Sequence, residues 1–274
     1  MLYKRIPWIA LLFSLIAVVI AGMALRQTPS LPTRTSAVHV PTPSFGQSAV
    51  VQPQDPAQLS NVRAALLEHP EIIVEALHAY EARKVIASRQ NSIAAVSANE
   101  KELLDDKGAV LGNPDGRNVL VVFTSFACGY CRNLYPDLLK LLESDRNVKV
   151  VVKEYPVFGP GSMLAAKASI AAGHQGRYPQ MYDALMRMTQ PFTKEMVRDA
   201  AVKMGLNTDL MFKDMETDET QAIIQVNLTL GQRVGISGTP SLIRQGSAVL
   251  TGAESYQTLA AFVQGNVAPA SQNN

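Results

Sequence analysis

The pattern of apolar and polar residues divides the chain into four main parts. Residues 6–25 form an uncharged apolar run behind Lys4 and Arg5, and residues 26–56 are rich in Pro, Ser and Thr without a helix or strand period. Apolar residues then recur at helical spacing over residues 57–106, and from residue 118 onward β-branched runs alternate with helical stretches. We therefore expect an export segment, a Pro-rich linker, an all-helical module and an α/β domain over residues 107–266, followed by a flexible tail over residues 267–274.

The first segment predicts export of everything that follows it. Its apolar run of 20 residues is long enough for a bilayer, which needs about 20, whereas a cleavable signal has an apolar region of about 7 to 15. Gly22 and Ala24 are nevertheless small residues at the spacing that a signal peptidase reads, which allows cleavage after Ala24. Residues 1–25 are therefore interpreted as a signal peptide or a signal anchor, and both alternatives stay open.

The helical module leaves more apolar surface than two helices can bury by themselves. Its apolar positions follow helical spacing, and a break between a short and a long helix is predicted at His69-Pro70. The positions that define the pattern are Val62, Leu66, Ile73, Leu77 and Tyr80. The module must pack on the following domain or on another copy of itself, and we favour self-association.

The remaining pattern predicts an α/β fold. Strands are expected over residues 118–126, 148–155, 239–244 and 248–251, with helices over residues 132–143 and 256–265. Five further helical stretches are expected at 163–172, 179–188, 194–204, 208–215 and 220–234. This order is that of a thioredoxin fold with an inserted helical domain over about residues 162–234, preceded by the all-helical N-terminal module.

The chain has two cysteines, Cys128 and Cys131, at the predicted junction of the first strand and its helix. A zinc site would need two further ligands, and the four histidines are scattered singly, so no metal site is expected. A Cys-x-x-Cys loop is also too short to constrain much of the unfolded chain as a structural disulfide. Redox exchange is left, with Cys128 as the thiolate nucleophile at the helix start and Cys131 as the resolving thiol.

Two other sequence features bear on function. Thr239-Pro240 opens a predicted strand where proline cannot donate to a ladder, and a cis bond or an ordinary trans turn both fit this place. The formal net charge of +2 is too close to balance for a nucleic-acid binder, so no nucleic-acid partner is expected.

Several motifs together resemble those of a known family. The motifs are Phe-Ala-Cys-Gly-Tyr-Cys (126–131), Lys-Glu-Tyr-Pro-Val-Phe-Gly-Pro (153–160) and Gly-Ile-Ser-Gly-Thr-Pro (235–240). Over about residues 108–265 the chain resembles the bacterial DsbA-like thiol:disulfide oxidoreductases. The module around Leu-Leu-Glu-His-Pro-Glu-Ile (66–72) is similar to the oligomerising N-terminal extension of the Com1 and ScsC branch, which includes dimers and trimers.

The resemblance implies a cis Pro240 that faces Cys128 and Cys131, with pairing of the substrate backbone at Thr239. It also implies a periplasmic protein without a cofactor that acts on unfolded or misfolded exported proteins. A membrane redox partner would recycle its thiols, and a homo-oligomer is expected, with a dimer favoured over a trimer. An oligomer would bias the activity toward isomerisation by placing several cysteine pairs around one cleft.

The chain departs from the family pattern at two places. Gly129 and Tyr130 stand where the prototype oxidase has Pro-His, so that enzyme's strong thiolate stabilisation is not carried over, although these two positions still tune the site. Val122 stands where relatives commonly keep a buried acid, so proton transfer to the second cysteine needs water or another group. Lys153 and Glu154 are candidates, although a pair of charges at a strand end is usually solvated.

Two other functions fit the same sequence. The two thiols could bind soft Cu(I), or the groove could matter more than the thiols, as in a chaperone-like substrate binder.

Overall fold

The computed structural model describes residues 56–188 and 191–266. The expected signal or anchor, the linker up to residue 55 and the tail over residues 267–274 lie outside the described residues. The chain divides into two units, Met1–Ala64 and Ala65–Asn274, and all elements after α2 (Pro56–Glu68) belong to the second. No helix within the described part of the chain is long and apolar enough to cross a membrane.

A five-stranded mixed sheet forms the centre of the second unit. Its strands are β1 (Val110–Gly112), β2 (Asn118–Thr124), β3 (Val148–Glu154), β4 (Ser241–Arg244) and β5 (Leu250–Thr251), in the spatial order β1-β3-β2-β4-β5. β2 and β3 are parallel and are connected through α5 (Gly129–Ser144), and the other neighbours are antiparallel. The central position of β2 explains its continuous apolar sequence, because residues on both of its faces are buried.

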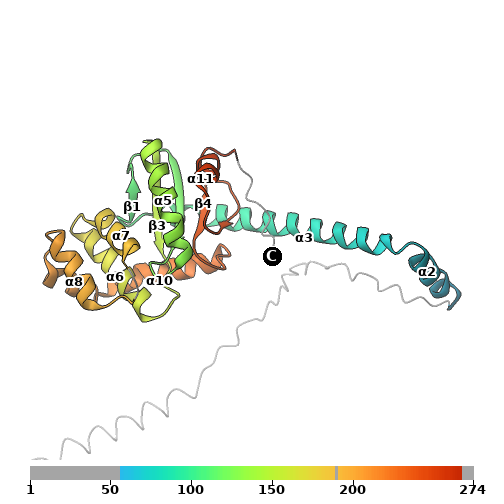
Figure 1. The fold of residues 1–274 in the computed structure, drawn as a ribbon, viewed down its shortest axis with the longest axis horizontal. Helices are drawn as coiled ribbons and strands as arrows, with labels where there is room; N and C mark the ends of the chain where they lie inside the picture. The colour runs from blue at the N-terminus through green and yellow to red at the C-terminus, as the bar shows by residue number, and fades with distance from the viewer. Residues whose placement is uncertain (1–55, 189–190, 267–274) are drawn as a thin grey trace, which may run out of the picture. The chain divides into compact units, whose positions relative to one another are not determined.

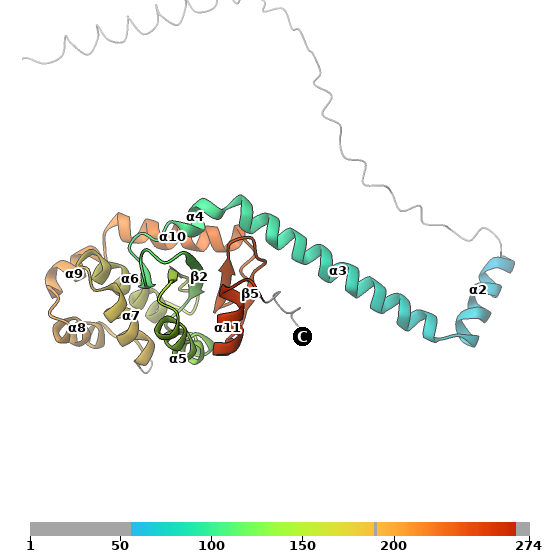
Figure 2. The same cartoon turned by 90° about the horizontal axis from the view of Figure 1, so that it is seen from above.

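Helices cover both faces of the sheet (Figure 2). α5 and α11 (Tyr256–Val263) pack on one face, and α4 (Glu100–Leu104) and α10 (Asp218–Arg233) pack on the other. Even-numbered residues of β2 join the first core and odd-numbered residues the second, as the alternation of a strand requires. Burial of each Val, Leu or Phe side chain of this strand stabilises the fold by about 1.5–3 kcal/mol.

The helical insertion consists of α6 (Pro160–His174), α7 (Tyr178–Arg187), α8 (Lys194–Lys203) and α9 (Thr208–Asp214), followed by α10 (Figure 1). α6 lies at its centre, where Ala165, Ala168 and Ala172 are completely or almost completely buried. Their small side chains let the neighbouring helices approach closely. The predicted thioredoxin fold with an inserted helical domain is confirmed, together with the helical region before it.

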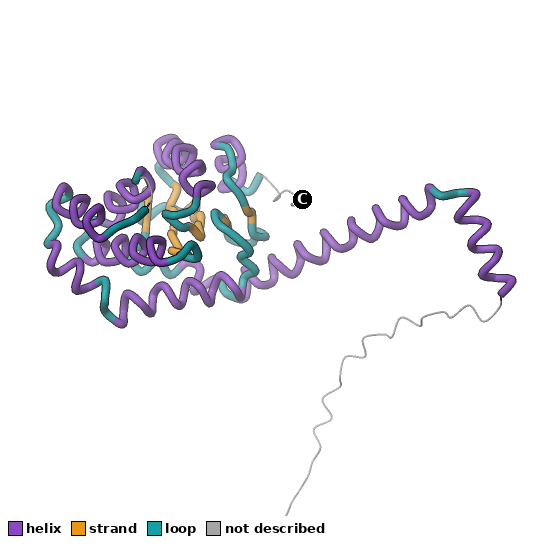
Figure 3. The backbone as a smooth tube through the Cα atoms, turned by 60° about the horizontal axis from the view of Figure 1, so that its bottom comes forward, coloured by secondary structure: helices purple, strands orange, loops and turns teal. Residues whose placement is uncertain are grey.

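The predicted break at His69-Pro70 separates α2 from α3 (Glu71–Ala98), a continuous helix that Figure 3 shows in purple. Only the end of α3 packs on the sheet: Val96 is buried, and the Ser92 hydroxyl accepts a hydrogen bond from the Val249 N–H at 3.0 Å. Farther toward its start, apolar side chains such as Ile73 and Leu77 are about half exposed, at 48% and 57%. The following domain therefore covers only the last turns of this helix.

Candidate active site

The cysteine pair lies where β2 passes into α5. Leu134, Leu138 and Leu141 recur on one side of α5 and fasten that side to the core, which fixes the start of the helix beneath the end of the strand. Cys128 is the N-cap residue, with extended backbone angles of φ −88° and ψ 121°. Its sulfur therefore lies at the end of the helix where unpaired backbone N–H groups stabilise negative charge.

The two thiols are free and buried, and their pKa values move in opposite directions. A hydrogen bond from the Cys131 side chain lowers the pKa of Cys128 to about 5, against the opposing effect of burial; Thr239 and the backbone N–H groups of Cys131 and Tyr130 add to the lowering. The same contact with Cys128, together with burial, raises the pKa of Cys131. At pH 7 a pKa near 5 leaves about 100 thiolates for each thiol, so the site holds one charged and one neutral sulfur.

The loop before β4 closes over Cys128. The Thr239–Pro240 peptide bond is cis, and the Cys128 thiol donates a hydrogen bond to the Thr239 carbonyl oxygen at 3.2 Å. Apart from its effect on the pKa of Cys128, the buried Thr239 hydroxyl has no hydrogen-bond partner in the described part of the chain. It is therefore available to the thiolate once the thiol proton has left.

A groove runs beside Tyr130, and two exposed apolar side chains lie in the loop after β3. Tyr130, between the two cysteines, is 68% exposed, and Val157 and Phe158 are about half exposed in the loop after β3. A groove of about 510 Å³ runs beside Tyr130, and its other lining residues are Asn133, Asp137, Gly252, Ala253, Glu254 and Ser255. Of these residues, the sequence analysis singled out only Tyr130 as part of the site. The only sequence signal for the others was the apolar pair Val157 and Phe158 in a loop.

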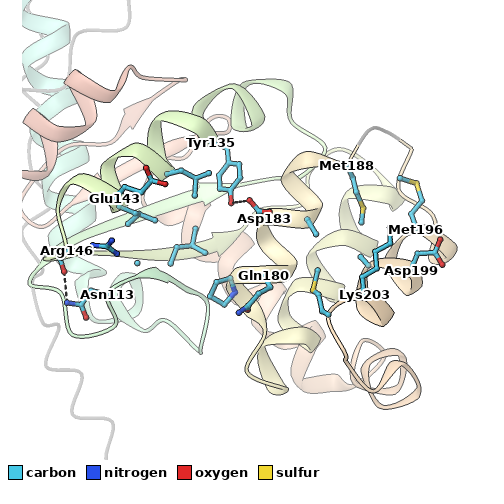
Figure 4. Close-up of a pocket in the computed structure, with 18 residues that line it drawn as sticks. Asn113, Tyr135, Glu143, Arg146, Gln180, Asp183, Met188, Met196, Asp199 and Lys203 are labelled. Atoms are coloured by element: carbon cyan, nitrogen blue, oxygen red, sulfur yellow. Dashed lines mark hydrogen bonds between the residues drawn. The ribbon is translucent and has the colours of Figure 1, made fainter.

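A larger cavity of about 1070 Å³ lies away from the cysteines, between α5, α7 and α8 (Figure 4). Its lining includes Tyr135, whose hydroxyl donates a hydrogen bond to Asp183 at 2.7 Å, as well as Met188 and Met196. Neither cysteine lines this cavity. Over residues 56–188 and 191–266, no three His, Cys, Asp or Glu side chains come together in a way that could hold a metal ion.

Two family models match the chain. The model described as DSBA-like thioredoxin domain matches residues 119–264, which is more than half of the chain and includes both cysteines and the cis Pro240. The chain belongs to the DsbA-like thioredoxin family. The model described as Copper resistance protein ScsC N-terminal domain matches residues 61–84, within the helical module, which confirms the resemblance to the ScsC branch.

Individual relatives agree with this membership. A thioredoxin-like oxidoreductase from Silicibacter pomeroyi is 35% identical, with 62% of this chain and 99% of that chain covered and a TM-score of 0.57. Proteus mirabilis ScsC in a transitional conformation is 29% identical, with 77% and 98% covered and a TM-score of 0.58. The thiol:disulfide interchange protein DsbC of Salmonella typhimurium is 22% identical over 92% of this chain and 94% of its own length.

The first curated relatives are longer proteins. They are Na(+)/H(+) antiporters, such as that of Salinispora arenicola, which is 26% identical over 60% of this chain, and the chain spans only about a quarter of their length. The family membership therefore rests on the match of the DsbA-like domain itself. The members of this family are disulfide oxidoreductases and isomerases.

Proposed function

We propose that the protein catalyses thiol:disulfide exchange on exported proteins, forming or isomerising their disulfides through Cys128-Gly129-Tyr130-Cys131. The observation that carries the proposal is the unequal pair of sulfurs, one with its pKa lowered to about 5 and a neighbour whose pKa is raised. Exchange needs such a pair, because the thiolate is the attacking species and a protonated second thiol waits until the mixed disulfide has formed.

The reaction balances in both directions. In isomerisation the Cys128 thiolate attacks a substrate disulfide, which forms a mixed disulfide and releases one substrate sulfur as a thiolate. In isomerisation another substrate thiolate then attacks the mixed disulfide, a new substrate disulfide forms, and Cys128 leaves as a thiolate. Where Cys131 instead loses its proton and attacks Cys128, the second substrate sulfur leaves, the substrate is reduced and the Cys128–Cys131 disulfide forms. In oxidation the Cys128–Cys131 disulfide is present first, a substrate thiolate attacks Cys128, and Cys131 leaves and takes up a proton.

Thr239 and Pro240 are proposed to bind the substrate chain beside Cys128. The short distance from the Cys128 sulfur to the Thr239 carbonyl oxygen, 3.2 Å, supports this role. The exposed side chain of Tyr130 and the apolar pair Val157 and Phe158 offer contacts to unfolded segments, which expose apolar residues that a folded protein would bury.

Matched serine variants test the assignment. Cys128→Ser is expected to abolish exchange, whereas Cys131→Ser is expected to accumulate mixed disulfides with substrates, because only the second variant keeps the nucleophile. Non-reducing electrophoresis of the protein with an unfolded, disulfide-containing substrate measures both outcomes. Adducts that formed with Cys128→Ser and not with Cys131→Ser would reverse the two roles. If a variant with both substitutions suppressed aggregation of the substrate as well as the wild-type protein does, the chaperone-like alternative would be favoured.

The location and partners of the protein are proposed from the family. One solved relative is a periplasmic thioredoxin-like protein from Salmonella enterica, 27% identical, which supports a periplasmic location for the domain over residues 107–266. Residues 1–25 would then be a cleaved signal or an inner-membrane anchor. Unfolded or misfolded exported proteins are the proposed substrates, and a membrane redox partner is proposed to recycle the thiols.

The helical module over residues 57–106 is proposed to assemble the protein into a dimer or a trimer. The supporting observation is the exposed apolar side chains of α3, including Ile73, Leu77 and Tyr80, because a contiguous surface of this kind usually marks an interaction site. Leu77→Glu is expected to lower the mass in solution to that of one chain, and Glu81→Gln, an exposed change on the same helix, is the matched control. An unchanged mass with Leu77→Glu would contradict the proposal.

A soft-metal function is the second candidate. The sulfurs of Cys128 and Cys131 are in hydrogen-bond contact, and thiolates are preferred ligands of Cu(I). Tight one-to-one binding of Cu(I) to the reduced protein, lost in Cys128→Ser, together with no turnover of a disulfide substrate, would favour this candidate over exchange.

A further inference from the structure

Lys153 and Glu154 are adjacent on β3, and their side chains therefore lie on opposite faces of the sheet. The Lys153 ammonium donates hydrogen bonds to the carbonyl oxygens of Glu102, at 2.9 Å, and of Asp105, next to α4. Glu154 lies on the other face, where its Oε1 accepts hydrogen bonds from the Ser169 hydroxyl, at 3.0 Å, and from the Tyr178 hydroxyl. The expectation of a solvated pair is wrong, because the residues are only 4% and 1% exposed.

The face that holds Glu154 is also the face of the cysteines. The core on this side contains Cys131 together with the even-numbered residues of β2 and β3, to which Glu154 belongs by alternation. In the parallel register Glu154 lies directly beside Thr124 on β2, and neighbouring strands are about 4.8 Å apart. Lys153 is on the opposite side of the sheet, so of the two candidates only Glu154 can act on the second cysteine.

Thr124 connects Glu154 with the active site. Hydrogen bonding to the Thr124 side chain opposes the rise in the pKa of Cys131 and of Tyr182. Of the remaining positions of β2 on this face, Leu120 and Val122 are apolar and fully buried, and Asn118 at the start of the strand carries no charge. Among the described residues of these two strands, Glu154 therefore supplies the carboxyl group on the cysteine side.

Only one of the two carboxyl oxygens of Glu154 makes hydrogen bonds within the described part of the chain. Oε1 accepts both hydrogen bonds, whereas Oε2 is buried without a partner in the described part of the chain. A buried carboxylate oxygen without a donor is costly, and a proton removes that cost. Burial raises the pKa of Glu154, while the hydrogen bonds from Tyr178 and Ser169 oppose the rise. Oε2 is thus a site that can accept and return a proton.

We propose that Glu154 accepts the proton of Cys131, by way of the Thr124 hydroxyl, when Cys131 resolves the mixed disulfide. The inference rests on the proposed function, in which Cys131 is the resolving thiol. The S–H bond of Cys131 breaks and its proton passes to the Thr124 oxygen. The Thr124 hydroxyl makes no hydrogen bond to Oε2 of Glu154 in the resting structure, so it turns toward Oε2 and gives up its own proton there. At the same time the Cys128–Cys131 bond forms and the substrate sulfur leaves with the electron pair of the broken mixed disulfide. In the oxidising direction the proton returns from Glu154 to Cys131.

Other ionisable groups surround Glu154 and influence its titration. They are Tyr178 and Tyr182 of α7, Lys153 on its own strand and, across a small cavity, Asp105, Asp106 and Lys107. Burial raises the pKa of both tyrosines far above their ordinary value, so they stay neutral donors near neutral pH. Asn227 of α10 also lines the cavity and carries no charge.

The experiment separates the two chemical steps in the full-length protein. A small peptide disulfide forms the mixed disulfide with Cys128, and the formation and the release of the peptide are timed separately by rapid acid quenching across a pH series. Glu154→Gln keeps the shape and the acceptor oxygen of the side chain. It is expected to slow the release about 100-fold near neutral pH, the scale of lost general base catalysis, while the formation step keeps its rate.

Ser169→Ala is the companion variant. It keeps the carboxyl group and removes a hydrogen bond that favours its charged form, so the midpoint of the release profile is expected to move to higher pH. Glu154→Asp is expected to restore part of the release rate. A purely structural role for Glu154 would slow both steps and leave the midpoint in Ser169→Ala unchanged.

The outcomes are distinct. Release in Glu154→Gln within twofold of wild type, with the same pH profile, would overturn this inference and leave the proposed function intact. Failure of the wild-type protein to form the mixed disulfide would overturn the proposed function itself. If Glu154→Gln does not fold, an unshifted midpoint in Ser169→Ala still overturns the inference.

Discussion

The Cys131 side chain makes the largest contribution to the low pKa of Cys128, so its removal is expected to raise that pKa measurably. A hydrogen bond to a charged group contributes about 1.5–3 kcal/mol, and each pKa unit corresponds to about 1.4 kcal/mol. Cys131→Ala is therefore expected to raise the pKa of Cys128 by about one to two units, from about 5 to about 6–7. Cys131→Ser keeps a hydroxyl donor at the same place and is expected to give a smaller rise.

The pH dependence has a defined sign. The pKa of Cys128 is lowered from 9.0 to about 5 in the folded protein, so its thiolate stabilises the reduced fold fully above about pH 9. This contribution shrinks as the pH falls and is lost below about pH 5, where the folded protein also binds the proton. The same protonation removes the nucleophile, so exchange is expected to stop on the acid side of the same midpoint.

The rate of alkylation by iodoacetamide reports the thiolate directly. Cys131→Ala and Cys131→Ser each contain one cysteine, so the rate as a function of pH gives the pKa of Cys128 alone, and the initial rate in the wild-type protein provides the reference. Equal midpoints in all three proteins would refute the reasoning, and would assign the low pKa to the backbone N–H groups at the start of α5 instead.

Two further predictions concern single side chains. Thr239→Val removes a hydroxyl that lowers the pKa of Cys128 and has no other partner among the described residues; the alkylation midpoint is expected to rise by up to about one unit without a lower Tm. Gly231→Ala places a methyl group 2.5 Å from the Tyr155 ring. The free energy of unfolding, measured in urea, is expected to fall by about 1–2 kcal/mol, because overpacking outweighs the gain in helix propensity. Gly173→Ala is its control, since the added atom meets Tyr178 at an ordinary 3.5 Å, and stability should be retained or increased. An equal change in the two alanine variants would contradict the packing argument.

The central fold could be predicted because its signals are local. The apolar run that begins at Asn118 and the leucine spacing of the next helix each specify one element, and the structure places both within a few residues of the predicted bounds. β1 was missed because it has three residues, Val110–Gly112, and is held mainly by its pairing with β3. A strand this short carries no readable period, so only the tertiary structure reveals it.

In the site, too, features that depend on neighbours in the sequence could be predicted, and features that depend on other helices could not. The position of Cys128 at a helix start predicts the thiolate from sequence, because Tyr130 and Cys131, which lower its pKa, follow it in the same helix. The contribution of Thr239 comes from the loop before β4 and could not be predicted in this way. The burial of Glu154 could not be predicted, since it depends on Ser169 and Tyr178, which reach it from two helices of the insertion. A pair of charges at a strand end has the same sequence pattern whether helices cover it or water does.

The direction of exchange follows from how strongly the Cys128 thiolate is stabilised. A more stable reduced form makes the disulfide a stronger oxidant, and pKa values of about 7 in thioredoxin and about 3.5 in DsbA accompany potentials of about −270 and −120 mV. A pKa of about 5 for Cys128 lies between these, so we expect a potential between the two values, measured in glutathione buffers.

Replacing Gly129-Tyr130 with Pro-His provides the matched comparison for that measurement. Gly129 is the first residue of α5, where proline is compatible with the helix, and no atom lies within 4 Å of the place where its Cβ would be built. A histidine at position 130 adds a cationic group near the thiolate, so the double variant is expected to have a lower Cys128 pKa and a less negative potential. A variant whose pKa fell while its potential stayed constant would show that the stability of the disulfide form, rather than that of the thiolate, sets the direction of exchange.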